Sequence, residues 1–132
     1  MSALLTEVKN HVFTITLNNV KTHNAFNDAI IAELIELFNT IENKKDIRLV
    51  VLKSNAASFC AGADLEWMGK MADYQFHENV DDALELAELL KRIDTCPKPT
   101  MAIVDGPAFG GGVGLVAACD FAIATEKARF CL

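Results

Sequence analysis

The chain has 132 residues, 52% hydrophobic and 23% charged, which is the composition of one folded domain with its own core. The net charge of −6 argues against a nucleic-acid-binding surface but leaves room for an anionic ligand held by backbone N–H groups and a few lysines. The apolar stretches are shorter than the about 20 residues that cross a bilayer, and the first residues lack the pattern of a secretory signal. We therefore expect no nucleic-acid partner and no membrane partner.

The four cysteines are not spaced like metal ligands or like a disulfide framework. No C-x-x-C pair is present, and no histidine lies near a cysteine in zinc-finger register. We interpret the thiols as small buried side chains and expect no metal site and a reducing, cytoplasmic compartment. These residues are Cys60, Cys96, Cys119 and Cys131.

The first third of the chain predicts a β-hairpin followed by a helix. Residues 4–9 and 12–18 alternate apolar and polar side chains, as half-buried strands do. The polar residues 18–24 lose that alternation and predict a loop. From Asn27 to Ile41, apolar residues recur at helical spacing behind a residue suited to cap a helix.

The middle third predicts one buried strand and two helices. Residues 47–52 form a short apolar run rich in β-branched side chains, and the small residues of 54–63 follow as a loop. Residues 64–71 can form one or two helical turns, and a longer helix is predicted over 78–94. The face of this longer helix expected to pack on the core carries Val80, Leu84, Ala87, Leu90 and Ile93.

The last third predicts a strand over 100–104, a glycine-rich turn, a helix over 111–118 and a buried strand over 120–124. A further strand is expected to begin at Phe130. This order predicts an α/β fold built from stacked strand–helix turns. The apolar ending 129–132 has no cap or polar tail, which we interpret as a sign of truncation, with apolar surface exposed on the last helix and strand.

Two loops of small residues, 58–65 and 105–114, each follow a predicted strand and open a predicted helix. Small residues let the backbone approach a ligand closely, and the first N–H groups of a helix have no partner within it. One donor from each loop could therefore hold a single carbonyl oxygen and stabilise an oxyanion or enolate.

Two other interpretations of the glycine-rich loop remain open. A glycine-rich turn before a helix can serve only for tight turning and close packing. Residues 112–117 also fit G-x-G-x-x-A, a variant of the dinucleotide-binding pattern. That pattern normally opens a first strand–helix–strand unit, whereas here it lies late in the chain behind a hairpin.

Both loops together resemble the enoyl-CoA hydratase/isomerase (crotonase) superfamily. Residues 59–65 are similar to its F-x-A-G-A-D-[IL] signature, and residues 99–112 to its P-x-[IVM]-A-x-[IV]-x-G-x-A-x-G-G-G signature. Residues 24–26 match its N-A-[LF] and residues 119–120 its C-D. The resemblance covers essentially the whole chain, in order and spacing.

The resemblance implies a crotonase-like spiral of ββα turns, of which residues 1–132 would be the N-terminal part of a single domain. It implies an acyl-CoA thioester substrate, no separate cofactor, and assembly into trimers or hexamers. The thioester oxygen would lie between the N–H groups of Ala63 and Gly111. The coenzyme A and acyl pocket would be lined by His23, Ala25, Ala61, Asp64, Leu65, Phe109, Gly110 and Gly114.

The chain departs from the hydratase pattern at both acid–base positions that the resemblance implies. Gly114 stands where one glutamate is expected, and the second would lie beyond Phe130, past the last residue. The resemblance therefore implies an enoyl-CoA hydratase or isomerase incomplete within these 132 residues, or a non-catalytic acyl-CoA-binding relative. A substitute acid–base group could come from His77, Glu78, Asp81 or Asp82, at the start of the predicted 78–94 helix. A solvated helix face explains these residues better.

Two finer features of the sequence each have two interpretations. Lys21 and Lys53 could contact phosphates, although a solvated surface lysine explains each of them more simply. The D-L-E-W-M run of residues 64–68 resembles branched-chain hydratases of the methylglutaconyl-CoA type. Trp67 could equally be a packing residue.

Overall fold

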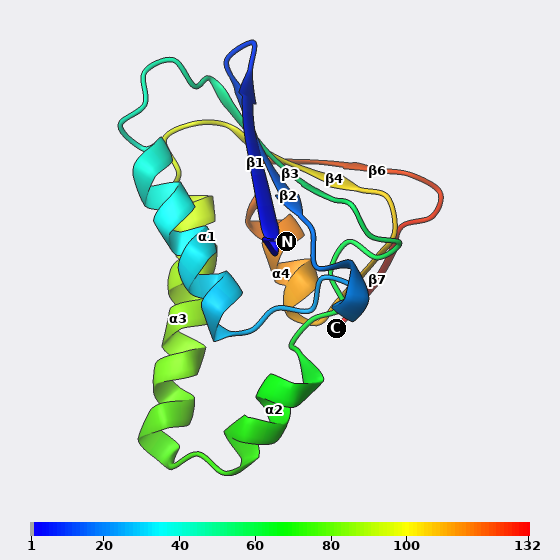
Figure 1. Ribbon diagram of the computed structural model, residues 1–132. Helices are drawn as coiled ribbons and strands as arrows, with labels where there is room; N and C mark the ends of the chain where they lie inside the picture. Colours follow the sequence, from blue (N-terminus) through cyan, green and yellow to red (C-terminus); the bar gives the residue numbers. More distant parts are fainter. Residues whose placement is uncertain (1) are drawn as a thin grey trace.

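The computed structural model describes residues 2–132 and contains one mixed sheet with helices along its flanks (Figure 1). Its strand order is β1-β2-β3-β4-β6, with β1 antiparallel to β2 and every later pair parallel. A second, two-stranded parallel sheet joins β5 to β7. The strands are β1 (Leu4–Lys9), β2 (Val12–Leu17), β3 (Leu49–Ser54), β4 (Thr100–Val104), β5 (Pro107–Phe109), β6 (Phe121–Ala124) and β7 (Arg129–Cys131).

Helices α1 and α3 lie side by side along one flank of the sheet, while α2 projects from the end of the molecule where the loops after β3 gather (Figure 1). Helix α4 packs against α3, β4 and β5. No helix within residues 2–132 is long and apolar enough to cross a membrane. The helices are η1 (Val20–Thr22, 3-10), α1 (Asp28–Ile41), α2 (Leu65–Ala72), α3 (Phe76–Asp94) and α4 (Gly111–Ala118).

The core follows from the periodicities of the sequence. Phe13 and Ile15, alternate residues of β2, are buried and pair in register with Val50 and Leu52 of β3. The inward face of α1 contributes a second apolar layer, because its apolar residues recur at helical spacing. The Asn27 side chain accepts from the Ile30 N–H at 3.0 Å and fixes where the helix begins. The buried residues of α1 are Ile30, Ile31, Leu34, Phe38 and Ile41.

The predicted α/β class, the hairpin and the helix ending at Ile41 are confirmed. Several boundaries differ from prediction by one or two residues; β3, for example, begins at Leu49 and α3 at Phe76. The expected loop 18–24 contains the 3-10 turn η1. Strand β5 was not predicted, because three residues within a glycine-rich turn are too few to show a period. The strand expected at Phe130 is confirmed as β7.

The burial predicted for the strand over 120–124 is wrong. All four residues of the edge strand β6 are exposed, with Phe121 58% and Ile123 54% accessible, because no element within residues 2–132 covers either face of this strand. An apolar strand sequence predicts a buried face but does not say which element covers that face. Strand β7 is exposed as well, as expected, whereas α4 buries Leu115 and Val116.

The face predicted to be buried on α3 is also wrong in part. The helix buries Leu89 and Ile93 and exposes Val80, Leu84 and Ala87. Both buried residues lie in the second half of α3, and the first half leaves Val80 and Leu84 exposed within residues 2–132.

Candidate active site

The loop after β3 is shaped by its own polar side chains. The Ser54 hydroxyl accepts from the Ala56 N–H at 2.9 Å and donates to the Ser58 carbonyl oxygen at 2.8 Å. At the other end, the Asp64 carboxylate accepts from the Trp67 N–H at 3.0 Å and caps α2. The Asp64 carboxylate thus holds the small residues between it and β3 at the mouth of a helix N-terminus.

The two small-residue loops are joined by backbone hydrogen bonds. The Phe59 N–H donates to the Pro107 carbonyl at 2.8 Å, and the Phe109 N–H donates to the Cys60 carbonyl at 2.9 Å. Their approach is close enough that a β-carbon added at Gly106 would lie 2.1 Å from the Ala57 carbonyl oxygen. Glycine is therefore required there for contact between the loops.

A third segment, around Asn24, is hydrogen-bonded to the loop that follows β3. The buried Asn24 amide donates to the Ser54 hydroxyl at 2.7 Å and to the Phe59 carbonyl at 3.3 Å, while its oxygen accepts from the Asn19 N–H at 2.8 Å. Asn24 adopts a left-handed backbone with φ 57°, which asparagine tolerates better than most residues. The Ala61 N–H then donates to the His23 carbonyl at 3.0 Å.

The backbone N–H groups of Ala63 and Gly111 donate no hydrogen bond to any atom within residues 2–132. Their neighbours are satisfied: the Asp64 N–H donates to the Phe26 carbonyl and the Gly110 N–H to the Cys131 carbonyl. Ala63 lies one residue before the Asp64 cap, and Gly111 is the first residue of α4. Neither N–H group is thus engaged by another group within residues 2–132.

A cavity of about 490 Å³ opens between η1 and the start of α2. It brings together six of the ten residues singled out from the sequence, together with Lys21 and with Thr22, which the sequence had not indicated. The lining consists of Lys21, Thr22, His23, Ala25, Ala61, Ala63, Asp64 and Leu65.

The other four residues singled out from the sequence do not line this cavity. Phe109 and Gly110 lie next to it, since a β-carbon added at Gly62 would be 3.1 Å from the Phe109 carbonyl oxygen. Gly111 follows them at the start of α4. At Gly114, a β-carbon would lie 3.4 Å from both δ carbons of Leu90 on α3, so a side chain there would start toward α3.

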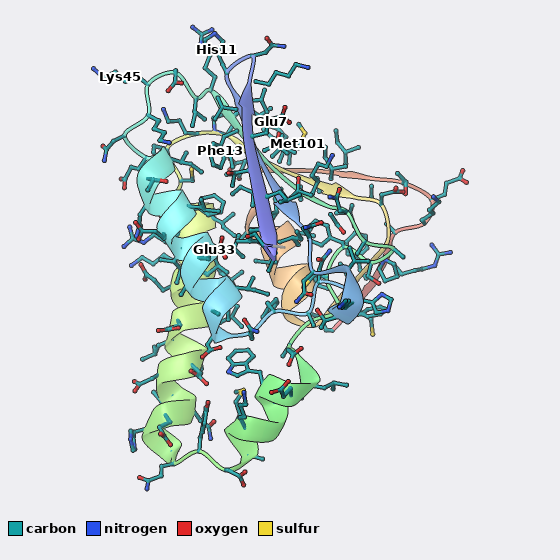
Figure 2. The ribbon with its side chains drawn as sticks, in the orientation of Figure 1. Glu7, His11, Phe13, Glu33, Lys45 and Met101 are labelled. Atoms are coloured by element: carbon teal, nitrogen blue, oxygen red, sulfur yellow. The ribbon has the colours of Figure 1, made fainter. Side chains whose placement is uncertain are left out.

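Lys53, the other candidate lysine, and His11, which the sequence did not single out, lie elsewhere. Lys53 borders a separate hollow with Asp105, on the sheet rather than at the cavity. The ring of His11 hydrogen-bonds to the Asp46 carbonyl at 2.7 Å, at the hairpin end of the molecule opposite α2 (Figure 2). Within residues 2–132, no three His, Cys, Asp or Glu side chains are grouped to hold a metal ion.

Burial holds the core thiols in their neutral form, raising the pKa of Cys60 and of Cys119 from 9.0 to about 11. The unfolded chain ionises these thiols at lower pH than the folded protein does. The contribution of these thiols to stability should therefore be constant below pH 9 and be lost as pH rises toward about 11.

Urea denaturation at several pH values checks this alkaline loss. Cys60→Ala should flatten the decline above pH 9, whereas Cys131→Ala, at an exposed position, should leave its slope unchanged. Equal slopes in the wild type and Cys60→Ala would show that the Cys60 thiol does not contribute to it.

Comparison with known proteins shows the family of this chain. The enoyl-CoA hydratase/isomerase family model matches residues 7–132. The chain belongs to the enoyl-CoA hydratase/isomerase family. A solved structure from Legionella pneumophila, provisionally named enoyl-CoA hydratase/isomerase (crotonase), is 45% identical, with a TM-score of 0.97 over 100% of this chain and 51% of its own.

Other members show the same relationship. The structure of an enoyl-CoA hydratase from Shewanella pealeana is 40% identical, with a TM-score of 0.96 over 99% of this chain and 49% of its own. The mitochondrial Delta(3,5)-Delta(2,4)-dienoyl-CoA isomerase of Mus musculus is 35% identical over 98% of this chain and 42% of its own length. The chain thus spans about half the length of the relatives it matches, and the predicted crotonase fold is confirmed.

Proposed function

We propose that this chain provides the oxyanion hole and part of the coenzyme A site of an enoyl-CoA hydratase or isomerase. The observation that carries the proposal is the pair of unpartnered N–H groups, at Ala63 and Gly111, on two loops that hydrogen-bond to each other beside a cavity. Two such donors stabilise the negative charge that develops on a thioester oxygen when an enolate forms.

The rest of the cavity suits the substrate class. Its walls combine small apolar residues, which admit a thioester chain, with Lys21 and His23 at the η1 side, which can face phosphate groups. The names of the relatives support an acyl-CoA thioester as the ligand of this chain. Assembly into trimers or hexamers and a methylglutaconyl-type acyl group remain predictions from the sequence.

The cavity lacks an evident acid–base pair. The Asp64 carboxylate is engaged as the cap of α2, and the His23 ring lies 3.5 Å from the Ser58 hydroxyl. Gly114 carries no proton-transfer group, and its β position faces Leu90. This last observation favours a second candidate function, an acyl-CoA-binding chain that does not catalyse hydration.

The 132-residue chain should therefore not hydrate crotonyl-CoA at a useful rate. Hydration needs a proton delivered to one carbon and a water activated at its neighbour, and general acid–base groups contribute about 10²–10⁴-fold each. Gly114→Glu should not restore turnover, because it supplies one carboxylate while hydration needs a second acid–base group that the cavity lacks. Loss of the enoyl-thioester absorbance follows the reaction directly.

The comparison needs wild type, Gly114→Glu and the uncharged control Gly114→Gln at equal concentration. Robust turnover by the wild type would show that the acid–base groups lie within these residues, and Asp64, Glu66 and His77 would be the ones to replace. Turnover restored by Gly114→Glu alone would show that the side chain of residue 114 reaches the substrate.

A further inference from the structure

Phe26 hydrogen-bonds on both sides of Ala63. The Phe26 N–H donates to the Gly62 carbonyl at 2.9 Å, and the Phe26 carbonyl accepts from the Asp64 N–H at 2.9 Å. In such a parallel bridge, the N–H of the residue between the two bonded groups points away from the pairing strand. The backbone of Phe26 therefore fixes the direction of the Ala63 N–H.

The ring of Phe26 contacts the other donor-bearing segment. A β-carbon added at Gly111 would lie 2.3 Å from the ring Cζ and 3.1 Å from Cε1, so the ring occupies the space beside the Gly111 backbone. Phe26 is 3% exposed, and its ring is held by the core. One residue thus contacts both N–H carriers, through its main chain on one side and its side chain on the other.

We propose that Phe26 is a positioning residue that sets the separation and relative direction of the Ala63 and Gly111 N–H groups. The proposal rests on the oxyanion hole proposed above. The position of the Phe26 ring also explains why residue 111 is a glycine, because the ring occupies the space that a β-carbon would need. Phe26 is not among the residues that line the cavity, so its proposed effect on a ligand is exerted through the two donors.

The other links between the loops do not perform this task. The Phe59–Pro107 and Phe109–Cys60 hydrogen bonds join the strand-like parts of the loops. Ala63 lies three residues beyond Cys60, after Gly62 with φ 90°, and Gly111 follows Gly110 with φ 53°. The Gly110 N–H is held by the Cys131 carbonyl, and Phe26 adds a contact to each donor-bearing residue beyond the paired parts of the loops.

The test compares Phe26→Ala with Phe38→Ala. Phe38 is an equally buried phenylalanine of α1, 4% exposed, that lies outside the loops and serves as the matched control. Phe26→Leu keeps more of the core packing in case the alanine variant folds poorly. Residual dipolar couplings of the ligand-free protein report the angle between the Ala63 and Gly111 N–H vectors.

The second readout is binding of acetoacetyl-CoA, a β-keto thioester whose enolate has its own absorbance. In Phe26→Ala we expect an altered N–H angle and about 10–100-fold weaker enolate binding, with the affinity for coenzyme A alone retained. Phe26→Leu should fall between, and Phe38→Ala should match the wild type in angle and enolate binding.

An unchanged N–H angle in both Phe26 variants would overturn the positioning role, as would equal losses of enolate and coenzyme A affinity. Failure of the proposed function looks different: the wild type itself would then bind acetoacetyl-CoA no more tightly than coenzyme A. The N–H angle is measured without ligand, so it tests Phe26 in that case too.

Discussion

Replacing Phe59 by alanine should lower the free energy of unfolding by about 3–5 kcal/mol, the usual cost of deleting a fully buried aromatic ring. Phe59 is 0% exposed and belongs to the main core cluster. Its backbone also accepts from the Asn24 amide and donates to Pro107, so the ring anchors the place where three segments meet. Urea denaturation measures the loss.

The matched control is Val8→Ala, an exposed apolar residue of β1 at 49% accessibility. A surface change of this kind should stay within about 0.5 kcal/mol of the wild type. A cost below about 1 kcal/mol for Phe59→Ala would mean that the core beneath the loop relaxes freely, contrary to the packing described. A residue other than Phe59 would then have to hold the three segments of the site together.

Most of the fold could be predicted from the sequence because its elements are strongly periodic. The alternation of residues 12–17 predicts a strand, and the helical spacing between Asn27 and Ile41 predicts a helix. The strand β6 shows the limit of such reasoning, since an apolar run indicates a buried face without naming its cover. The same holds for Val80 and Leu84, exposed on the first half of α3.

The candidate site was predictable where backbone geometry decides it. Small residues before a helix indicated Ala63 and Gly111, and both lie at helix starts with unused N–H groups. Phe26 could not be assigned a role from sequence, because a phenylalanine in an apolar match gives no sign of which backbone it touches. The direction of Gly114 toward Leu90 likewise depends on how α3 packs against α4.

Removing either N–H donor should weaken binding of the acetoacetyl-CoA enolate by about 10–150-fold, since a hydrogen bond to a charged group contributes about 1.5–3 kcal/mol. An ester in place of the peptide bond removes the N–H without adding a side chain. Ligation at Cys60 gives access to both positions, Gly62–Ala63 and Gly110–Gly111. A third ester, at the nitrogen of Ala57, controls for the effect of an ester in the same loop.

Esters at both donor positions separate two possible causes of weaker enolate binding, the lost N–H donor and a weakened carbonyl acceptor. An ester at Ala63 also weakens the Gly62 carbonyl as acceptor for the Phe26 N–H, whereas the ester at Gly111 leaves that bond intact and weakens the Gly110 carbonyl as acceptor for the Val113 N–H. A loss at both positions therefore reports the donors themselves. A loss at Ala63 alone would report the Phe26 contact.

The most direct test of the oxyanion hole is thus enolate binding by wild type and the three ester proteins, followed through the enolate absorbance and set against binding of coenzyme A alone. The account predicts a loss of enolate affinity for the Ala63 and Gly111 esters, none for the Ala57 ester, and unchanged affinity for coenzyme A in all three. Enolate affinity equal to that of the wild type in both donor esters would contradict it.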